Sequence, residues 1–165
     1  MLASMNYTTL LILLTVSAYS ADGYLLAVRH CEPDSQSGSL TSAGIVQAEA
    51  LADRLKGTKF TKVVCTSLIR TYETAKIIRD RLGLQVRIET NDVFNQDVGG
   101  PADWVPGLKL LANNAGDDII LLVTHAPVLD ALFKQDKVDA SIDYGAGIEI
   151  RFRNNIIDYK PLLIK

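Results

Sequence analysis

The most informative segment of this chain is Tyr24-Leu25-Leu26-Ala27-Val28-Arg29-His30. An apolar run of strand length ends in an arginine and a histidine, and a buried strand has no use for either side chain. Ile119-Ile120-Leu121-Leu122-Val123-Thr124 is a second apolar run, and His125, the other of the chain's 2 histidines, follows it. In an open α/β sheet the carboxyl ends of the strands form the ligand-binding edge. The sequence therefore predicts a site at that edge, to which each of these strands brings a histidine.

Strand and helix patterns alternate along most of the remaining chain. Apolar residues at helical spacing predict helices over residues 41–56, 67–82, 108–115 and 127–133, with Thr41 and Thr66-Ser67 as N-caps of the first two. Short apolar or alternating runs predict strands over 60–65 and 85–89, and residues 90–106 contain Gly99-Gly100-Pro101 and are predicted to form a long loop. Residues 147–153 and 156–163, joined by Asn154-Asn155, predict a closing β-hairpin. We therefore expect a three-layer α/β/α domain with a mostly parallel central sheet and a C-terminal antiparallel hairpin.

Length and composition fit one domain. The 165 residues are 48% hydrophobic, which is enough for a single core. The net charge is −2, and the acidic and basic residues are interspersed without a basic block. Nucleic acid is therefore not an expected partner.

The first twenty residues differ from the rest of the chain. Residues 1–20 contain no charged side chain, Leu10-Leu11-Ile12-Leu13-Leu14-Thr15-Val16 is a compact apolar run, and Ala18-Tyr19-Ser20 resembles a cleavage site. This pattern predicts a signal peptide over residues 1–20, cut before Ala21, and a mature domain over 21–165 that is periplasmic or secreted. An uncleaved anchor is the alternative, but the apolar run is far shorter than the roughly 20 residues that a spanning helix needs.

Export bears on the two cysteines, Cys31 and Cys65, which lie at the ends of two predicted strands. In an oxidising compartment they are candidates for a disulfide. Two separate buried thiols are the other interpretation, and the sequence leaves the choice open.

The predicted edge collects positive charge. Arg29 and His30 end one strand, His125 follows another, and Arg70 lies in the first turn of the helix after Cys65. Guanidinium groups together with helix N-termini form an anion site, and they suit phosphate better than a single carboxylate. The chain has neither a G-x-x-x-x-G-K-[ST] nor a G-x-G-x-x-G motif.

Four motifs resemble the histidine phosphatase superfamily, the phosphoglycerate-mutase-like phosphatases. Arg29-His30 is similar to the family's Arg-His-Gly, and Val123-Thr124-His125 is similar to its second-histidine strand. The family's Leu-Thr…Gly…Gln-Ala motif resembles Leu40-Thr41-Ser42-Ala43-Gly44 with Gln47-Ala48. Its Ser-x-x-x-Arg…Thr-Ala motif resembles Thr66-Ser67-Leu68-Ile69-Arg70 with Thr74-Ala75. The motifs occur in the family's order. Two positions depart from the pattern, because Cys31 and Ala126 stand where the family often has glycine.

The resemblance implies a role for each of these residues. His30 would be the nucleophile that accepts the phosphoryl group, and Arg29, Arg70 and His125 would bind its oxygens. The general acid would come from the loop after the third strand, where Asp92 lies closest to the expected position and Asp97 and Glu89 compete with it. The family needs no metal and no cofactor, and we expect none here.

The resemblance leaves several functions open. The leading interpretation is an exported phosphatase of a small-molecule or terminal phosphomonoester, and the chain's size and leader resemble the exported lipopolysaccharide core heptose phosphatase branch. A protein phosphohistidine phosphatase would fit if the leader is not a signal peptide, and compact loops make a mutase a weaker candidate. A non-catalytic phosphate-binding module is a further alternative. So is a zinc site made by His30, Cys31, Cys65 and His125, although two arginines would repel the cation.

Overall fold

The computed structural model describes residues 23–135, 142–153 and 156–162. The predicted leader lies outside the described residues. The strands are β1 (Gly23–Arg29), β2 (Lys62–Cys65), β3 (Ile88–Thr90), β4 (Ile119–Thr124), β5 (Gly147–Arg153) and β6 (Ile156–Leu162). The helices are α1 (Ser42–Arg54), α2 (Ile69–Arg81), α3 (Pro101–Asn113) and α4 (Ala126–Gln135), with a short 3₁₀ helix, η1 (Asp92–Phe94), after β3.

The strands form one six-stranded sheet in the order β3-β2-β4-β1-β5-β6. β1, β2, β3 and β4 run parallel, whereas β5 pairs antiparallel with both β1 and β6. This arrangement confirms the mostly parallel α/β sheet with an antiparallel C-terminal hairpin. Because β1 and β4 are parallel neighbours, their carboxyl ends meet at the same edge.

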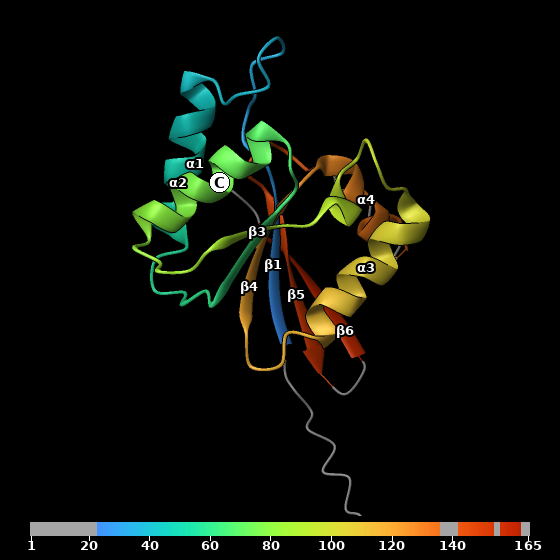
Figure 1. Cartoon of the computed structure of the whole chain (residues 1–165). Coiled ribbons are helices and arrows are strands. Elements are labelled where there is room, and N and C mark those ends of the chain that lie inside the picture. Colours follow the sequence, from blue (N-terminus) through green and yellow to red (C-terminus); the bar gives the residue numbers. More distant parts are fainter. Residues whose placement is uncertain (1–22, 136–141, 154–155, 163–165) are drawn as a thin grey trace, which may run out of the picture.

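Helices cover both faces of the sheet, α1 and α2 on one side and α3 and α4 on the other (Figure 1). Successive residues of a strand point to opposite faces. In β1, Leu25 and Ala27 therefore pack in the core under α3 and α4, and Leu26 and Val28 pack in the core under α1 and α2. A strand buried on both faces explains the uninterrupted apolar runs in the sequence.

The predicted loop over residues 90–106 is wrong in part. η1 occupies residues 92–94, and α3 begins at Pro101 and contains Pro106. Proline suits the first turn of a helix, so Pro101 begins α3 instead of excluding it. Trp104, Leu108 and Leu111 then pack at helical spacing against the sheet, and this packing stabilises the helix. The glycines and prolines of this segment had favoured the prediction of a loop.

The helix starts were predicted with mixed success. Thr41 is the N-cap of α1 and accepts a hydrogen bond from the backbone N–H of Gly44, as predicted. For α2 the prediction is wrong, because the N-cap is Leu68, which makes no side-chain capping bond. The hydroxyl of Thr66 has another partner at the site.

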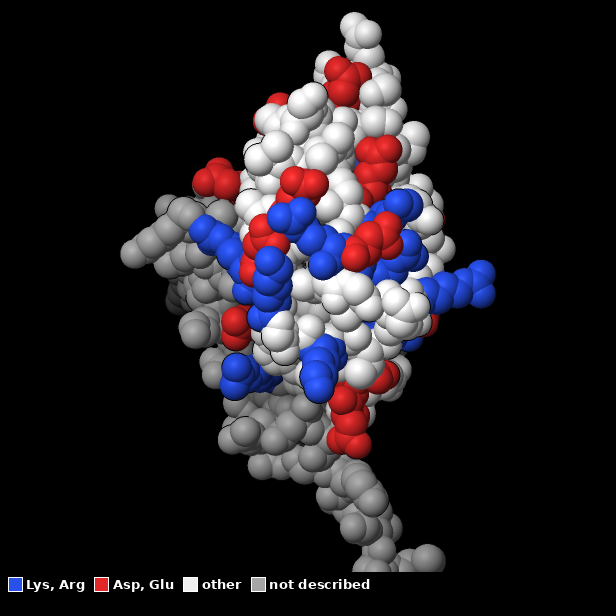
Figure 2. Space-filling view, turned by 90° about the vertical axis from the view of Figure 1, so that its left-hand side faces the viewer, with Lys and Arg blue, Asp and Glu red and all other residues white. Residues whose placement is uncertain are grey.

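Charges of both signs are interspersed on the face that α1 and α2 present (Figure 2). Exposed ion pairs join Arg81 to Asp53 at 2.7 Å and Lys76 to Asp80 at 2.9 Å. This face therefore has no continuous basic surface of the kind that binds nucleic acid. Over the described part of the chain, no helix is long and apolar enough to cross a membrane.

Candidate active site

Two histidines meet at the carboxyl edge of the sheet. β1 ends at Arg29 and β4 at Thr124, which are register partners, so the next residues, His30 and His125, leave the sheet side by side. The backbone N–H of His30 donates to the carbonyl oxygen of Thr124 at 2.9 Å and extends the parallel ladder by one bond. The two imidazole centroids lie 5.2 Å apart at an interplanar angle of 66°. The structure thus brings together the pair of histidines that the sequence placed at this edge.

The imidazole of His30 is held in one tautomer. Nδ1 lies 2.8 Å from the carbonyl oxygen of Cys31, which can only accept, so Nδ1 carries the proton. The side chain is buried, with 5% of the residue exposed. Burial is the main cause that lowers the pKa of His30 to about 4, and the nearby Arg70 and Arg29 charges lower it further. At neutral pH the ring is therefore uncharged, with its lone pair on Nε2.

His125 is buried completely and has a different kind of partner. Its Nε2 lies 3.2 Å from the hydroxyl of Thr66, which in turn lies 2.8 Å from the hydroxyl of Thr71. Burial, followed by the neighbouring His30, lowers the pKa of His125 to about 3. Its Nδ1 is buried and has no hydrogen-bond partner among the described residues. This nitrogen is free to contact a ligand.

Both predicted arginines lie at the same edge. Arg29 and Arg70 are each close enough to lower the pKa of both histidines. Arg70 is in the first turn of α2, and its carbonyl oxygen accepts a 2.8 Å bond from the hydroxyl of Thr74. The same hydroxyl accepts the backbone N–H of Cys31 at 3.1 Å. Thr74 therefore connects the peptide after His30 to the turn that bears Arg70.

The acid candidates are placed less favourably. Asp92, in η1, accepts the backbone N–H of Ser67 at 2.8 Å, and this bond is the main cause of its lowered pKa. A general acid needs the opposite shift. Glu89 makes a 2.9 Å ion pair with Lys62 along β2 and β3, and Asp97 is exposed in the loop after η1. The lowered pKa of Asp92 favours its carboxylate form, so the acid role of Asp92 stays a prediction.

The loop after His30 is tied to α1. The backbone N–H of Glu32 donates to Oε1 of Gln47, and the carbonyl oxygen of Glu32 accepts the N–H of Thr41. A Cβ at Gly44 would overlap that same carbonyl, so α1 can begin this close to the loop only with glycine there. The polar loop is thus fixed at the rim of the site by residues of the Leu-Thr…Gly…Gln-Ala motif.

Cys31 and Cys65 are both free and buried. Cys31 packs with Leu40 and Ala48, whereas Cys65 belongs to the core under α1 and α2. Burial raises the pKa of each thiol to about 11. The structure therefore supports two inert thiols and not the disulfide.

Tyr144, which no sequence pattern singled out, also lies at this edge. Its ring centroid lies 3.8 Å from Cζ of Arg29 and 5.7 Å from the ring of His30. The available signal was an aromatic residue in the turn Asp143-Tyr144-Gly145, directly before the strand that pairs with β1. It was not recognised, because strand pairing cannot be derived from so short a segment.

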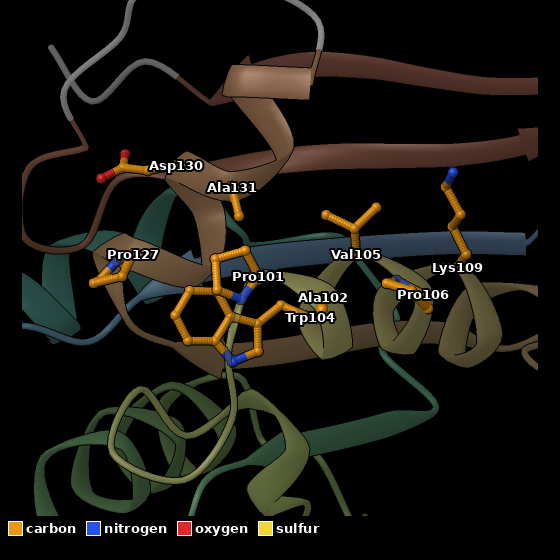
Figure 3. Close-up of a pocket in the computed structure, with 9 residues that line it drawn as sticks. All are labelled: Pro101, Ala102, Trp104, Val105, Pro106, Lys109, Pro127, Asp130 and Ala131. Carbon is orange, nitrogen blue, oxygen red and sulfur yellow. The ribbon is translucent and has the colours of Figure 1, made fainter.

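The described residues contain no group of three or more His, Cys, Asp or Glu side chains that could hold a metal. A cavity of about 900 Å³ lies between α3 and α4, with Lys109 at one end and Asp130 at the other (Figure 3). Trp104, Val105 and several prolines line it, and none of the predicted site residues does. The cavity is thus separate from the histidine pair.

The fold and the paired histidines define a phosphoglycerate-mutase-like α/β protein. The model of the histidine phosphatase superfamily (branch 1) matches residues 25–92. Over these residues the chain is similar to that superfamily, and the structural likenesses below show the fold. No curated protein matches the chain in sequence.

Three similar solved structures illustrate the likeness. Phosphoglycerate mutase from Bacillus anthracis has a TM-score of 0.75 at 13% identity, over 87% of this chain and 93% of that one. The protein histidine phosphatase SixA, complexed with tungstate, has a TM-score of 0.69 at 19% identity, over 83% and 94%. A mycobacterial glucosyl-3-phosphoglycerate phosphatase in complex with VO3 has a TM-score of 0.65 at 15% identity, over 87% and 99%. At these identities the likeness shows the fold, and the activity has to be argued from the site.

Proposed function

We propose that this chain is an exported phosphatase that hydrolyses a phosphomonoester through a phosphohistidine on His30. One observation carries the proposal: Nδ1 of His30 is bonded to a carbonyl oxygen, which leaves an unprotonated Nε2 in a site with two arginines. A neutral imidazole nitrogen is a nucleophile at physiological pH, and guanidinium groups bind the phosphoryl oxygens.

In the proposed reaction Nε2 of His30 attacks phosphorus, and the bond from phosphorus to the ester oxygen breaks. Arg29, Arg70 and His125 bind the phosphoryl oxygens and offset the charge that they gain in the transition state. The leaving oxygen takes a proton, for which Asp92 is the proposed donor. Water then attacks the phosphohistidine and gives a proton back to Asp92, the nitrogen–phosphorus bond breaks, and inorganic phosphate is released with His30 neutral again.

The state of Asp92 favours a second candidate function. Asp92 is held as a carboxylate by Ser67, so in this structure it has no proton to give. Sugar and alkyl phosphates have basic leaving oxygens that need such a proton. A phosphohistidine substrate leaves as imidazole, which can take its proton from solvent on the other ring nitrogen. A protein phosphohistidine phosphatase therefore remains the alternative, followed by a non-catalytic phosphate-binding module.

The export proposal rests on the sequence of residues 1–20. An uncharged leader that ends in Ala18-Tyr19-Ser20 supports cleavage before Ala21 and a periplasmic or secreted domain. For an exported enzyme we propose a small-molecule or terminal phosphoester substrate, of which heptose phosphate of the lipopolysaccharide core is the first to test. N-terminal sequencing of protein from its natural host is expected to start at or near Ala21. An intact Met1 would favour the phosphohistidine alternative.

The proposed activity is tested with an aryl phosphate, an alkyl or sugar phosphate and a phosphohistidine peptide. We expect turnover of the aryl ester that a chelator does not affect, and a rapidly quenched reaction in which His30 carries acid-labile, base-stable phosphate. Turnover of the peptide with little turnover of the sugar ester would select the alternative. Phosphate binding without turnover of any of the three would leave the binding module.

A further inference from the structure

Arg29 is held by residues 142–147, the segment that leads into β5. Its Nη1 donates to the carbonyl oxygen of Ile142 at 2.7 Å. Its guanidinium lies over the ring of Tyr144, with Cζ 3.8 Å from the ring centroid. Its backbone N–H donates to the carbonyl oxygen of Ala146 at 2.8 Å. One short segment thus fixes both the backbone and the side chain of this arginine.

The backbone of the segment places Tyr144 against Arg29. The N–H of Ala146 donates to the carbonyl oxygen of Asp143 at 3.0 Å, which closes a turn with Tyr144 and Gly145 at its centre. Gly145 has a φ of 74°, a conformation that glycine adopts without steric cost. A Cβ at Gly147 would lie 2.5 Å from the carbonyl oxygen of Ala27, so only glycine lets the segment run this close to β1.

The contacts leave one edge of the guanidinium free. Tyr144 lies against its face, and Ile142 accepts from Nη1. Nε is buried and has no hydrogen-bond partner among the described residues. Nε–H and one N–H of Nη2 point in the same direction, which is the fork that binds two oxygens of one phosphoryl group. The segment therefore determines which edge of Arg29 remains for a ligand.

The same aromatic ring borders the nucleophile. The centroid of Tyr144 lies 5.7 Å from that of His30, and the planes are tilted by 46°. Arg29 lowers the pKa of His30 and is therefore within electrostatic range of that ring. Tyr144 thus lies beside both Arg29 and His30. The relative position of these two side chains decides whether a phosphoryl group whose oxygens are bound by Arg29 has its phosphorus within reach of His30.

We propose that Tyr144 is a positioning residue that holds the guanidinium of Arg29 with its Nε–Nη2 edge toward the phosphoryl group. The inference deepens the proposed function and rests on it for the identity of the anion. A cation held over an aromatic face is stabilised relative to the same cation in water, and the fixed orientation reduces the ordering that a ligand would otherwise require.

The inference is tested by replacing Tyr144 with Leu and with Phe. Tyr144→Leu removes the aromatic face and is expected to lower the affinity for inorganic phosphate and kcat/KM for an aryl phosphate by about five- to thirtyfold. Tyr144→Phe keeps the face and is expected to stay within about threefold of the original protein. A loss in Tyr144→Leu that is absent in Tyr144→Phe would show that the aromatic face is needed and that the hydroxyl group of Tyr144 is not. It would also show that the loss does not come from general disruption of the fold. Thermal unfolding checks that each variant is folded, and Tyr144→Met replaces the Leu variant if that one does not fold.

The chain offers a matched control in Tyr24. Cζ of Arg151, on β5, lies 5.6 Å from the ring centroid of Tyr24, on β1. Neither residue is among the predicted site residues. Tyr24→Leu removes an arginine–tyrosine contact without touching the site. We expect phosphate affinity and turnover to stay at the level of the original protein.

A double-mutant cycle shows whether Tyr144 acts through Arg29. In an Arg29→Gln background, Tyr144→Leu is expected to cause little additional loss of phosphate affinity. An equal loss in both backgrounds would mean that Tyr144 contacts the ligand itself and would overturn the inference, as would unchanged phosphate affinity in Tyr144→Leu. Because phosphate affinity needs no turnover, a protein that binds phosphate through Tyr144 but hydrolyses no ester would refute the proposed function and leave this inference standing.

Discussion

The ends of β1 and β4 deliver the same side chain to the same edge, but they give it different partners. His30 donates through Nδ1 to the carbonyl oxygen of Cys31, which can only accept. His125 meets the hydroxyl of Thr66 through Nε2, and a hydroxyl can donate or accept. The first arrangement fixes one tautomer and directs a lone pair outward on Nε2. The second leaves the proton of His125 free to lie on either nitrogen, according to what a ligand at Nδ1 requires.

The two proposed roles, nucleophile for His30 and binding group for His125, fit this difference. A nucleophilic nitrogen has to be unprotonated when it attacks phosphorus, whereas a group that binds phosphoryl oxygens has to supply a hydrogen. The fixed tautomer of His30 suits the first task, and the adaptable environment of His125 suits the second. Each of the following predictions tests one side of that difference.

Removing the two imidazoles gives the largest expected effect and the clearest contrast. His30→Ala is expected to reduce turnover to the background rate and to abolish labelling of the protein by phosphate, because it removes the acceptor of the phosphoryl group. His125→Ala removes one contact to the phosphoryl oxygens and is expected to cost about 10²–10³-fold in kcat, with labelling of His30 retained. Phosphate found on His125, or full turnover by His30→Ala, would reverse the assignment.

Asp92→Asn tests whether the carboxylate at Ser67 also serves the reaction. Asparagine can accept the same N–H of Ser67 but cannot donate an acidic proton, so the fold should be kept. If Asp92 protonates the leaving group, turnover of an alkyl phosphate is expected to fall by about 10²–10⁴-fold, and turnover of a nitrophenyl ester by much less. Equal rates for the variant and the original protein on both esters would limit Asp92 to a structural role.

The lowered pKa of His30 predicts the effect of acid on stability. Between pH 6.5 and about 4 the unfolded chain binds a proton on His30 that the folded protein does not bind. The free energy of unfolding therefore decreases as the pH is lowered across this window. The expected loss is about 3 kcal/mol for this residue. Denaturant unfolding at pH 7, 5.5 and 4 measures it, and the loss should be smaller in His30→Gln. The proposed nucleophile, His30, stays neutral down to about pH 4, so an acid limb of kcat/KM near pH 6.5 that reports this residue would contradict its low pKa.

Thr66→Val gives the smallest expected effect. Valine keeps the shape of threonine but removes the hydroxyl that is hydrogen-bonded to Nε2 of His125. The hydrogen bond between Nδ1 of His30 and the carbonyl oxygen of Cys31 is not changed. Loss of one neutral hydrogen bond at a binding group is expected to lower kcat/KM by about three- to tenfold. The yield of phosphorylated His30 in single-turnover labelling should not change. A loss as large as that of His125→Ala would mean that Thr66 controls the reactive tautomer itself.

The framework of this protein could be predicted from local sequence patterns. Two apolar runs that end in Arg29-His30 and in His125 predicted strands of a mostly parallel sheet and a site at their carboxyl ends. The structure confirms the sheet, makes the two strands neighbours and brings the two histidines together. Such a prediction succeeds because a buried strand excludes polar residues along its whole length, so a polar residue in the pattern marks the strand's end. The N-cap Thr41 was predictable for a similar reason, since a cap acts on backbone groups only a few residues away.

The groups that surround the two histidines, in contrast, depend on the packed fold and could not be predicted from the sequence. The carbonyl of Cys31 fixes the tautomer of His30, the hydroxyl of Thr66 lies at Nε2 of His125, and the ring of Tyr144 lies against the guanidinium of Arg29. Strand order brings Tyr144 to the site from far along the chain. The same holds for Asp92, whose N–H partner lies on the segment after β2, and for α3, which packing stabilises in spite of its prolines. The separation of the two cysteines into different apolar clusters is also a property of the packed fold. Burial and long-range hydrogen bonds depend on contacts between distant segments, and local sequence patterns do not encode those contacts.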